Sequence, residues 1–134
     1  MNLDQFVKDN QITARAYPAK INPNAVGFGA GAKHWTVVLK LGGWTGEKKI
    51  SVPFTQGSML HDPPTAVDVL ECLVSDSQTW ENTTTHYEMC EEYGMTPSED
   101  TERTYIVMGE QARNLKQFLG NDRYRELLWE VEPA

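Results

Sequence analysis

The spacing of the hydrophobic residues changes along this chain close to residue 64. Before that point, residues 34–41 and residues 47–55 each place every second, apolar side chain on one face. Such alternation predicts two β-strands, and the glycine-rich segment 42–46 between them predicts an antiparallel hairpin. Because Pro53 cannot donate a ladder hydrogen bond, we expect the second strand to lie at an edge of the sheet.

The residues before this hairpin carry weaker signals. Apolar residues at helical spacing predict a short helix over 2–9, and residues 12–17 predict a strand that stops at Pro18. Residues 18–33 contain proline, glycine and asparagine in a pattern that is typical of a long loop.

After residue 64 the apolar residues recur at helical spacing. Thr65, followed by Asp68, resembles a capping box at the start of a helix, and the polar stretch 76–85 predicts the loop after that helix. A second start signal lies at Thr96, which we expect to cap a helix that runs to Gly120.

Two shorter helices complete the predicted helical part. Residues 86–93 predict a helix that ends at Gly94. Its inward-facing side chains are expected to be Tyr87, Cys90 and Tyr93. Asn121 is expected to cap the last helix.

Strands followed by helices favour the α+β class. We expect a small antiparallel β-sheet of two to three strands packed against a C-terminal three-helix half. The 134 residues fit a single domain, 1–134, in which 1–60 is mainly β and basic and 61–134 is helical and acidic. The expected core residues of the sheet are Trp35, Leu39, Val52 and Phe54.

The composition excludes several classes of protein. No apolar stretch approaches the ~20 residues of a membrane span, and the N-terminal residues do not predict a signal peptide. Cys72 and Cys90 are too few for a disulfide framework, so we expect a reducing cytoplasm and two thiols on buried helix faces. Glu71 should raise the pKa of the Cys72 thiol.

Charge is divided unevenly along the chain. Residues 1–60 carry seven basic and three acidic side chains, whereas residues 61–134 carry five basic and sixteen acidic ones. The net charge is −7 and the sequence pI is about 4.9, which predicts no direct binding to nucleic acid.

The acidic half has two interpretations. No lysine or arginine occurs between Lys49 and Arg103, while eleven acidic residues do. This stretch could be a solvated face that keeps the protein soluble, and some of its acids also suit the first turn of a helix. Alternatively, it could bind a host protein or ribonucleoprotein with a basic surface. The candidate residues are Glu88, Glu91, Glu92, Glu99 and Glu102.

Two tryptophans and one glycine-rich segment are further candidates. Trp44 at the hairpin tip and Trp80 in a predicted polar loop could anchor a partner, or could fold back over the core. The segment Gly27–Gly31 resembles a phosphate-binding loop, but it precedes a strand rather than a helix. We find no motif for catalytic residues, a cofactor or a metal, and therefore expect a non-enzymatic protein.

Several short segments carry a resemblance. They are His34-Trp35 at the start of a strand, residues 64–73 followed by Ser75-Asp76, the helix end Glu92-Tyr93-Gly94, and residues 114–120 leading to Glu126-Leu127-Leu128-Trp129. Together they resemble a family of small accessory proteins of tailed bacteriophages and prophages. The resemblance implies a protein that works in the cytoplasm of a bacterial host. Small acidic phage proteins include inhibitors of host defence, among them anti-CRISPR proteins and DNA mimics.

These observations lead to one main hypothesis and two alternatives. The main hypothesis is a phage-type interaction protein whose acidic surface binds and inhibits a nucleic-acid-binding defence complex of the host, such as a CRISPR-Cas complex. The first alternative is a small nucleotide-binding or small-molecule-binding accessory protein or enzyme that uses Gly27–Gly31. The second is a virion or assembly component that associates with itself. The oligomeric state is left open.

Overall fold

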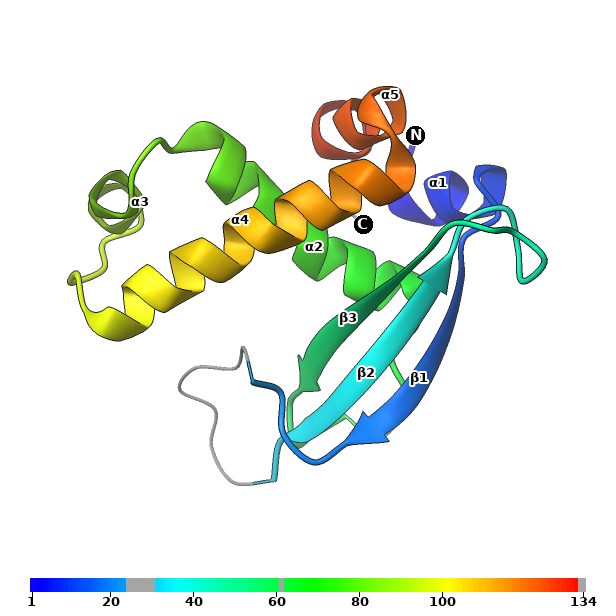
Figure 1. Cartoon of the computed structure of the whole chain (residues 1–134), viewed down its shortest axis with the longest axis horizontal. Helices are drawn as coiled ribbons and strands as arrows, with labels where there is room; N and C mark the ends of the chain where they lie inside the picture. Colours follow the sequence, from blue (N-terminus) through cyan, green and yellow to red (C-terminus); the bar gives the residue numbers. More distant parts are fainter. Residues whose placement is uncertain (24–30, 61, 133–134) are drawn as a thin grey trace.

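The computed structural model of the chain describes residues 1–23, 31–60 and 62–132. In these ranges one short helix precedes three strands, and the other helices follow (Figure 1). The predicted α+β class, with the sheet before the helical half, is confirmed. The elements are α1 (Leu3–Asp9), β1 (Thr13–Ala19), β2 (Lys33–Lys40), β3 (Lys49–Gln56), α2 (Ala66–Asn82), α3 (His86–Glu92), α4 (Glu99–Leu119), α5 (Asn121–Arg125) and the π-helical turn η1 (Glu126–Glu130).

The strands form one antiparallel sheet in the order β1-β2-β3. β2 and β3 make the predicted hairpin, with Val37 opposite Val52, and Pro53 lies in an edge strand as expected. β1 pairs with β2 as far as Ala19, so the prediction that this strand stops at Pro18 is wrong. β1 is also an edge strand, and an edge strand tolerates a proline because one side of its backbone has no partner.

Helix α2 is longer than its sequence predicts. It begins with the expected capping box at Thr65 but continues to Asn82, so the predicted loop over 76–85 is wrong for most of its length. The cause is tertiary packing, because Trp80 lies against Tyr105 of α4 with ring centroids 4.8 Å apart. Packing against a neighbouring helix stabilises helical structure in a polar segment whose helix propensity alone does not predict a helix.

Two helix starts also differ from their predicted positions. α4 is capped by Ser98 rather than Thr96, because the Ser98 hydroxyl accepts a hydrogen bond from Thr101 N–H at 3.2 Å. Gly120 ends α4 with a φ of +83°, as expected, and the same residue is the N-cap of α5. Asn121 is therefore the first residue of α5 and does not cap it.

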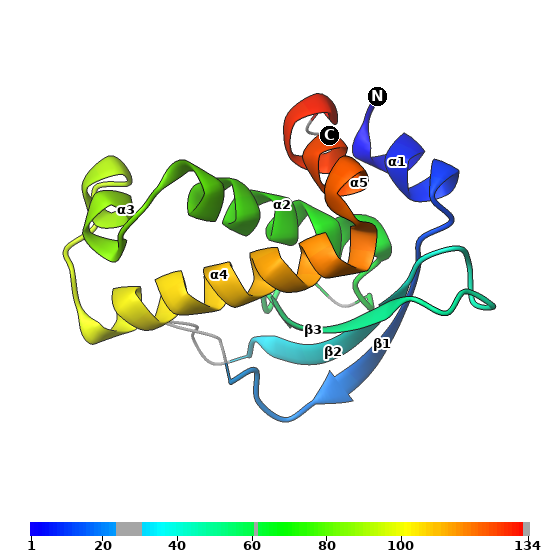
Figure 2. The same cartoon turned by 45° about the horizontal axis from the view of Figure 1, so that its top comes forward.

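The helices α2 and α4 lie over one face of the sheet (Figure 2). The core between these layers contains Leu39 and Val52 as predicted, whereas Trp35 and Phe54 are half-buried against it. A second, smaller core cluster lies where α3 meets α4. Within the described ranges, none of the helices combines the length and apolar character needed to cross a bilayer.

Candidate functional site

We call residues 86–103, which comprise α3 and the first turns of α4, the acidic end. The two helices contact one another at one end of the long axis of the molecule (Figure 1). This segment contains six acidic residues and one arginine. All five glutamates predicted to bind a partner are exposed here, Glu88, Glu91 and Glu92 on α3 and Glu99 and Glu102 on α4.

Glu88 has a structural role in addition to its charge. The hydroxyl of Thr85, the N-cap of α3, accepts a hydrogen bond from Glu88 N–H at 3.1 Å. The Glu88 carboxylate accepts from the Thr84 hydroxyl at 2.6 Å and from Thr84 N–H at 3.1 Å, which holds the pKa of Glu88 below its usual range. Glu91 and Glu92 make no such bond in the described part of the chain and are freer to meet a partner.

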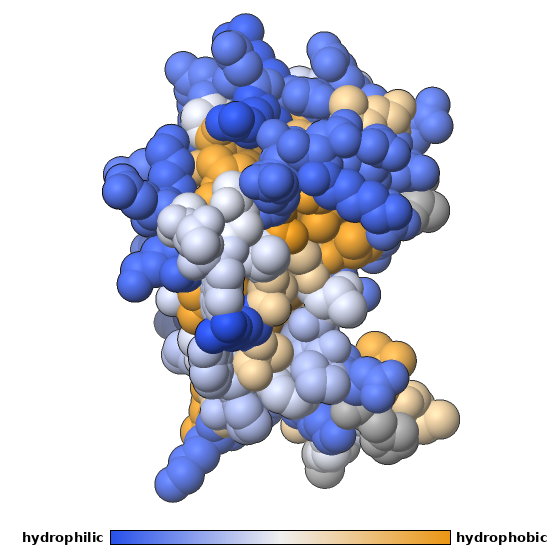
Figure 3. All heavy atoms as spheres, turned by 90° about the vertical axis from the view of Figure 1, so that its right-hand side faces the viewer, coloured by the Kyte–Doolittle hydropathy of each residue, from blue (hydrophilic) through white to orange (hydrophobic). Residues whose placement is uncertain are grey.

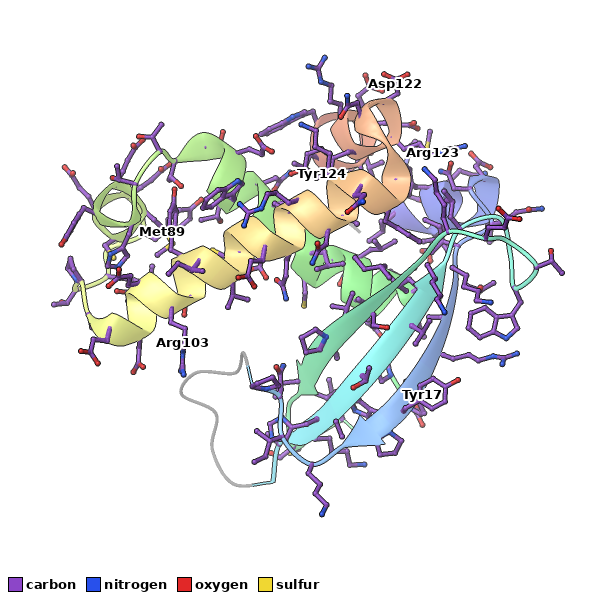
Figure 4. The ribbon with its side chains drawn as sticks, viewed as in Figure 1. Tyr17, Met89, Arg103, Asp122, Arg123 and Tyr124 are labelled. Atoms are coloured by element: carbon purple, nitrogen blue, oxygen red, sulfur yellow. The ribbon has the colours of Figure 1, made fainter. Side chains whose placement is uncertain are left out.

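Helix α3 is fixed on α4 by one polar and one apolar contact. The His86 Nε2 atom lies 2.6 Å from the Thr101 hydroxyl oxygen, which joins the first turns of the two helices. Met89 and Cys90 are buried against Tyr105 of α4 (Met89 is labelled in Figure 4). These contacts fix α3 against α4, and the carboxylates of both helices are exposed at the same end of the molecule.

Four large apolar side chains are exposed among or beside these carboxylates. Tyr87 is 71% exposed, and Tyr93, Met95 and Ile106 are also exposed. The prediction that Tyr87 and Tyr93 face inward is wrong. The buried face of α3 is centred on Met89 and Cys90, so Tyr87 lies well off that face, and Tyr93 is the C-cap residue beyond the last turn. A helical wheel places Tyr87 off the buried face once Met89 is known to be buried, but the sequence alone does not show that Met89 faces the core.

Arg103 does little to neutralise the acidic end. It forms the single salt bridge found among the described residues, at 3.7 Å from Asp100, and both side chains are largely exposed (Figure 4). Exposed pairs of this kind contribute about 0.2–1 kcal/mol, so Arg103 is not held firmly against the carboxylates. The acidic end keeps a strong net negative charge.

Trp80 packs inside the helical half instead of standing in a loop. It lies on α2, where its ring contacts Tyr105 and covers Gly109 of α4. A Cβ atom placed on Gly109 would approach the ring to 2.7 Å, which shows how closely the two helices fit. Trp80 is half-buried in this contact and is a poor candidate for a partner anchor.

Trp44 lies in the loop between β2 and β3, at the opposite end of the molecule from the acidic end (Figure 1). The Arg15 guanidinium lies 3.9 Å and the Lys40 ammonium 4.6 Å from the centroid of its ring. Trp44 is half-buried. Trp44 and the five glutamates, all predicted to bind a partner, therefore lie at opposite ends of the molecule.

The two thiols lie in different environments. Cys90 is buried as predicted, but Cys72 is exposed, so its predicted burial is wrong. The apolar residues that precede and follow Cys72 in α2 face the core, whereas Cys72 itself lies off that buried face of the helix. Partial desolvation, followed by the carboxylates of Asp76, Glu71 and Asp68, raises the pKa of the Cys72 thiol.

We expect Cys72 to be the thiol that reacts in the folded protein, slowly at pH 7.5 and much faster as the pH rises above 9. The thiolate is the reactive form, and its raised pKa keeps the thiolate scarce near neutrality. Iodoacetamide labelling followed by mass spectrometry, with Cys72→Ser and Cys90→Ser as controls, measures both rates. Labelling of Cys90 as fast as that of Cys72 would contradict the burial of Cys90.

A small cavity of about 180 Å³ lies where β3, α2 and α4 meet. Its lining is mostly apolar but includes Asp76 and Gln111, and the Oε1 atom of Gln111 is buried without a hydrogen-bond partner. Burial raises the pKa of Asp76 to about 6. The Cys72 thiol also lines this cavity, and its raised pKa keeps it mainly protonated near neutral pH.

Two other sequence interpretations concern ligands. Most of the Gly27–Gly31 segment, and the central part of the predicted loop 18–33, lie outside the described residues. In the ranges that the structure describes, no group of three or more His, Cys, Asp or Glu side chains is placed to hold a metal ion.

The acidic end is thus an ordered, exposed surface that combines carboxylates with aromatic and aliphatic side chains. Comparisons of the chain with protein-family models, with curated proteins and with solved structures find no significant match.

Proposed function

We propose that this chain is a non-enzymatic interaction protein whose acidic end binds a basic surface on a nucleic-acid-binding host complex and inhibits that complex. The observation that carries this proposal is the exposure of Glu91, Glu92, Glu99 and Glu102 on two helices fixed against each other. The phage context, and a defence complex such as CRISPR-Cas as the target, rest on the sequence resemblance and are part of the same proposal.

Electrostatics supports a basic partner over an acidic or neutral one. A surface of one sign of charge attracts the opposite sign, which raises the rate of encounter and orients the partners. A protein site that binds nucleic acid presents lysine and arginine for phosphates. Carboxylates spaced along α3 and α4 can pair with those cations and so exclude the nucleic acid.

The exposed aromatic residues can slow dissociation of the complex, which surface charges alone do little to change. Rim charges mainly affect association, whereas buried aromatic anchors slow dissociation. Tyr87 is exposed beside Glu88 and Glu91 and has its ring 5.2 Å from His86, measured between centroids. We assign Tyr87, rather than Trp44 or Trp80, as the principal anchor at the acidic end.

The double variant E91K/E92K is expected to slow association with the partner by tenfold or more at low salt. These two carboxylates have no structural partner in the described ranges, so the free energy of unfolding should change by no more than about 0.5 kcal/mol. The partner is first captured on the immobilised chain from nuclease-treated bacterial lysate and identified by mass spectrometry. Association rates are then measured with the purified partner at two salt concentrations.

The matched control is E110K/E130K, which makes the same change of net charge at exposed positions outside the acidic end. If the acidic end binds the partner, this control retains most of the wild-type rate, and the difference between the two variants shrinks at high salt. Equal rates for E91K/E92K and the control at low salt would reject the acidic end as the binding surface.

Tyr87→Ala is expected to speed dissociation by about fivefold or more and to leave the association rate nearly unchanged, as for a buried interface anchor. Because Tyr87 is exposed, its truncation should not unfold α3. A dissociation rate equal to that of the wild-type protein would show that Tyr87 is not an anchor of the interface.

A further inference from the structure

The face of the sheet that points away from the helices has its own character. Ala14, Val37, Leu39 and Val52 pack toward the core, and side chains alternate along a strand. The opposite face therefore presents Arg15 and Tyr17 of β1, Lys40 of β2 and Lys49 of β3. We call these four residues, together with Trp44, the outer face. None of the described helices covers it (Figure 2).

Two cations of the outer face occupy positions in which their charges destabilise the sheet. Lys40 and Lys49 are directly opposite each other in the register of β2 and β3. Like charges in this position destabilise a sheet. The described residues include no carboxylate that pairs with Arg15, Lys40 or Lys49. Local departures from stabilising patterns are expected where a surface has a function, and an anionic ligand would relieve this repulsion.

Trp44 fixes two of these cations in place. Arg15 and Lys40 both lie over its ring, and the Lys40 ammonium also donates to the Trp44 carbonyl oxygen at 3.3 Å. Tyr17 is 50% exposed and points outward from β1 (Figure 4). Figure 3 looks onto the hairpin end, where residues of intermediate hydropathy cover most of the lower part of the view and hydrophobic residues form separate patches. A polar ligand suits such a surface better than an apolar one.

We propose that the outer face binds single-stranded nucleic acid, with Arg15, Lys40 and Lys49 contacting phosphates and Tyr17 stacking on a base. Cations that follow a backbone beside an exposed aromatic ring are the recurring features of single-strand binding. The acidic net charge of the whole chain opposes this only weakly. Charges are screened beyond ~10 Å at 0.1 M salt, and the acidic end lies at the far end of the molecule.

The test uses a fluorescein-labelled dT20 oligonucleotide and fluorescence anisotropy at 100 and 300 mM salt. Three phosphate contacts on a single strand give a logarithmic salt slope of about −2, so the wild-type protein should bind about tenfold more weakly at 300 mM. In K40Q/K49Q one cation remains, and binding at 100 mM should weaken while the salt effect falls to about twofold. The control R103Q/R125Q, with the same charge loss in the helical half, should bind like the wild-type protein.

Tyr17→Ala is expected to weaken binding by about 5- to 150-fold, as for loss of one stacked base, without changing the salt slope. Tyr17→Phe should retain the binding affinity of the wild-type protein, because phenylalanine keeps the aromatic ring. Circular dichroism checks that each variant is folded. No binding at 100 mM, or an unchanged salt slope in K40Q/K49Q, overturns the proposal. Equal binding of a dA20·dT20 duplex or of polyglutamate also overturns it in favour of non-specific attraction of polyanions. E91K/E92K should still bind dT20, so failure here and failure at the acidic end are distinguishable.

Discussion

Replacing Gly109 with valine is expected to destabilise the fold by about 2–3 kcal/mol, as for overpacking of a well-packed core. Gly109 is buried on α4 under the ring of Trp80, and even a single Cβ atom would approach Cη2 and Cζ3 of that ring to 2.7 Å. The ring is wedged against Tyr105 and cannot move freely. Urea denaturation measures the change in the free energy of unfolding.

The cause can be separated from a general effect of valine on α4 by a double-mutant cycle with Trp80→Leu. Leucine removes the colliding ring atoms, so G109V should cost less in the W80L background, with a coupling energy of about 1–2 kcal/mol. Gly109→Ala and Gly120→Ala are poor substitutes as controls, because alanine improves helix propensity at the first position and opposes a positive φ at the second. Additive effects of G109V and W80L would show that the two side chains do not collide.

Much of the fold follows from local patterns in the sequence. The alternation around Val37 and Val52 specifies which face of the hairpin is buried, and the capping box at Thr65 specifies where α2 begins. The apolar residues of α4 recur at helical spacing, and Tyr105 and Leu115 are buried accordingly. In these places local propensity and tertiary packing favour the same structure, which is why the sequence alone suffices.

The predictions are wrong where packing between segments distant in the sequence determines the local structure. Residues 76–82 have too few apolar side chains to predict a helix, yet Trp80 extends α2 by fitting onto Gly109. Nothing in the local sequence identifies that glycine as the partner of that tryptophan. Similarly, Cys72 is placed in the middle of a helix by its sequence, but the rotation of α2 against the core leaves it exposed.

The candidate site shows the same division. Charge predicts that Glu91 and Glu92 are exposed, because unpaired carboxylates are rarely buried. Whether α3 turns Tyr87 inward or outward depends on its docking through Met89 and His86, which seven residues of sequence do not reveal. The uneven division of charge between the two halves can be seen in the sequence. The position of Lys40 opposite Lys49, by contrast, is known only from the register of the strands.

Replacing Asp76 with asparagine is expected to stabilise the protein at pH 7.5 and to leave its stability unchanged near pH 3.5. Burial raises the pKa of Asp76 to about 6 from its ordinary value of 3.8. A raised carboxyl pKa means that folding favours the protonated form, so the stabilising contribution of Asp76 is present below pH ~4 and is lost as the pH rises toward 6. The difference between these two pKa values corresponds to at most about 3 kcal/mol, and we expect a gain of about 1–3 kcal/mol for D76N at pH 7.5.

The measurement is the difference in the free energy of unfolding between D76N and the wild-type protein at both pH values, because the other carboxylates contribute equally to both proteins. Glu71→Gln is the matched control, since Glu71 is an exposed carboxylate on the same helix and its removal should change stability by no more than about 0.5 kcal/mol. The gain for D76N should appear between pH 4 and pH 6, where the wild-type carboxyl ionises. A loss of stability at pH 7.5 would instead mean that the Asp76 carboxylate is favourably paired in the folded protein. That result would contradict the desolvation of Asp76 that its position beside β3 and α4 implies.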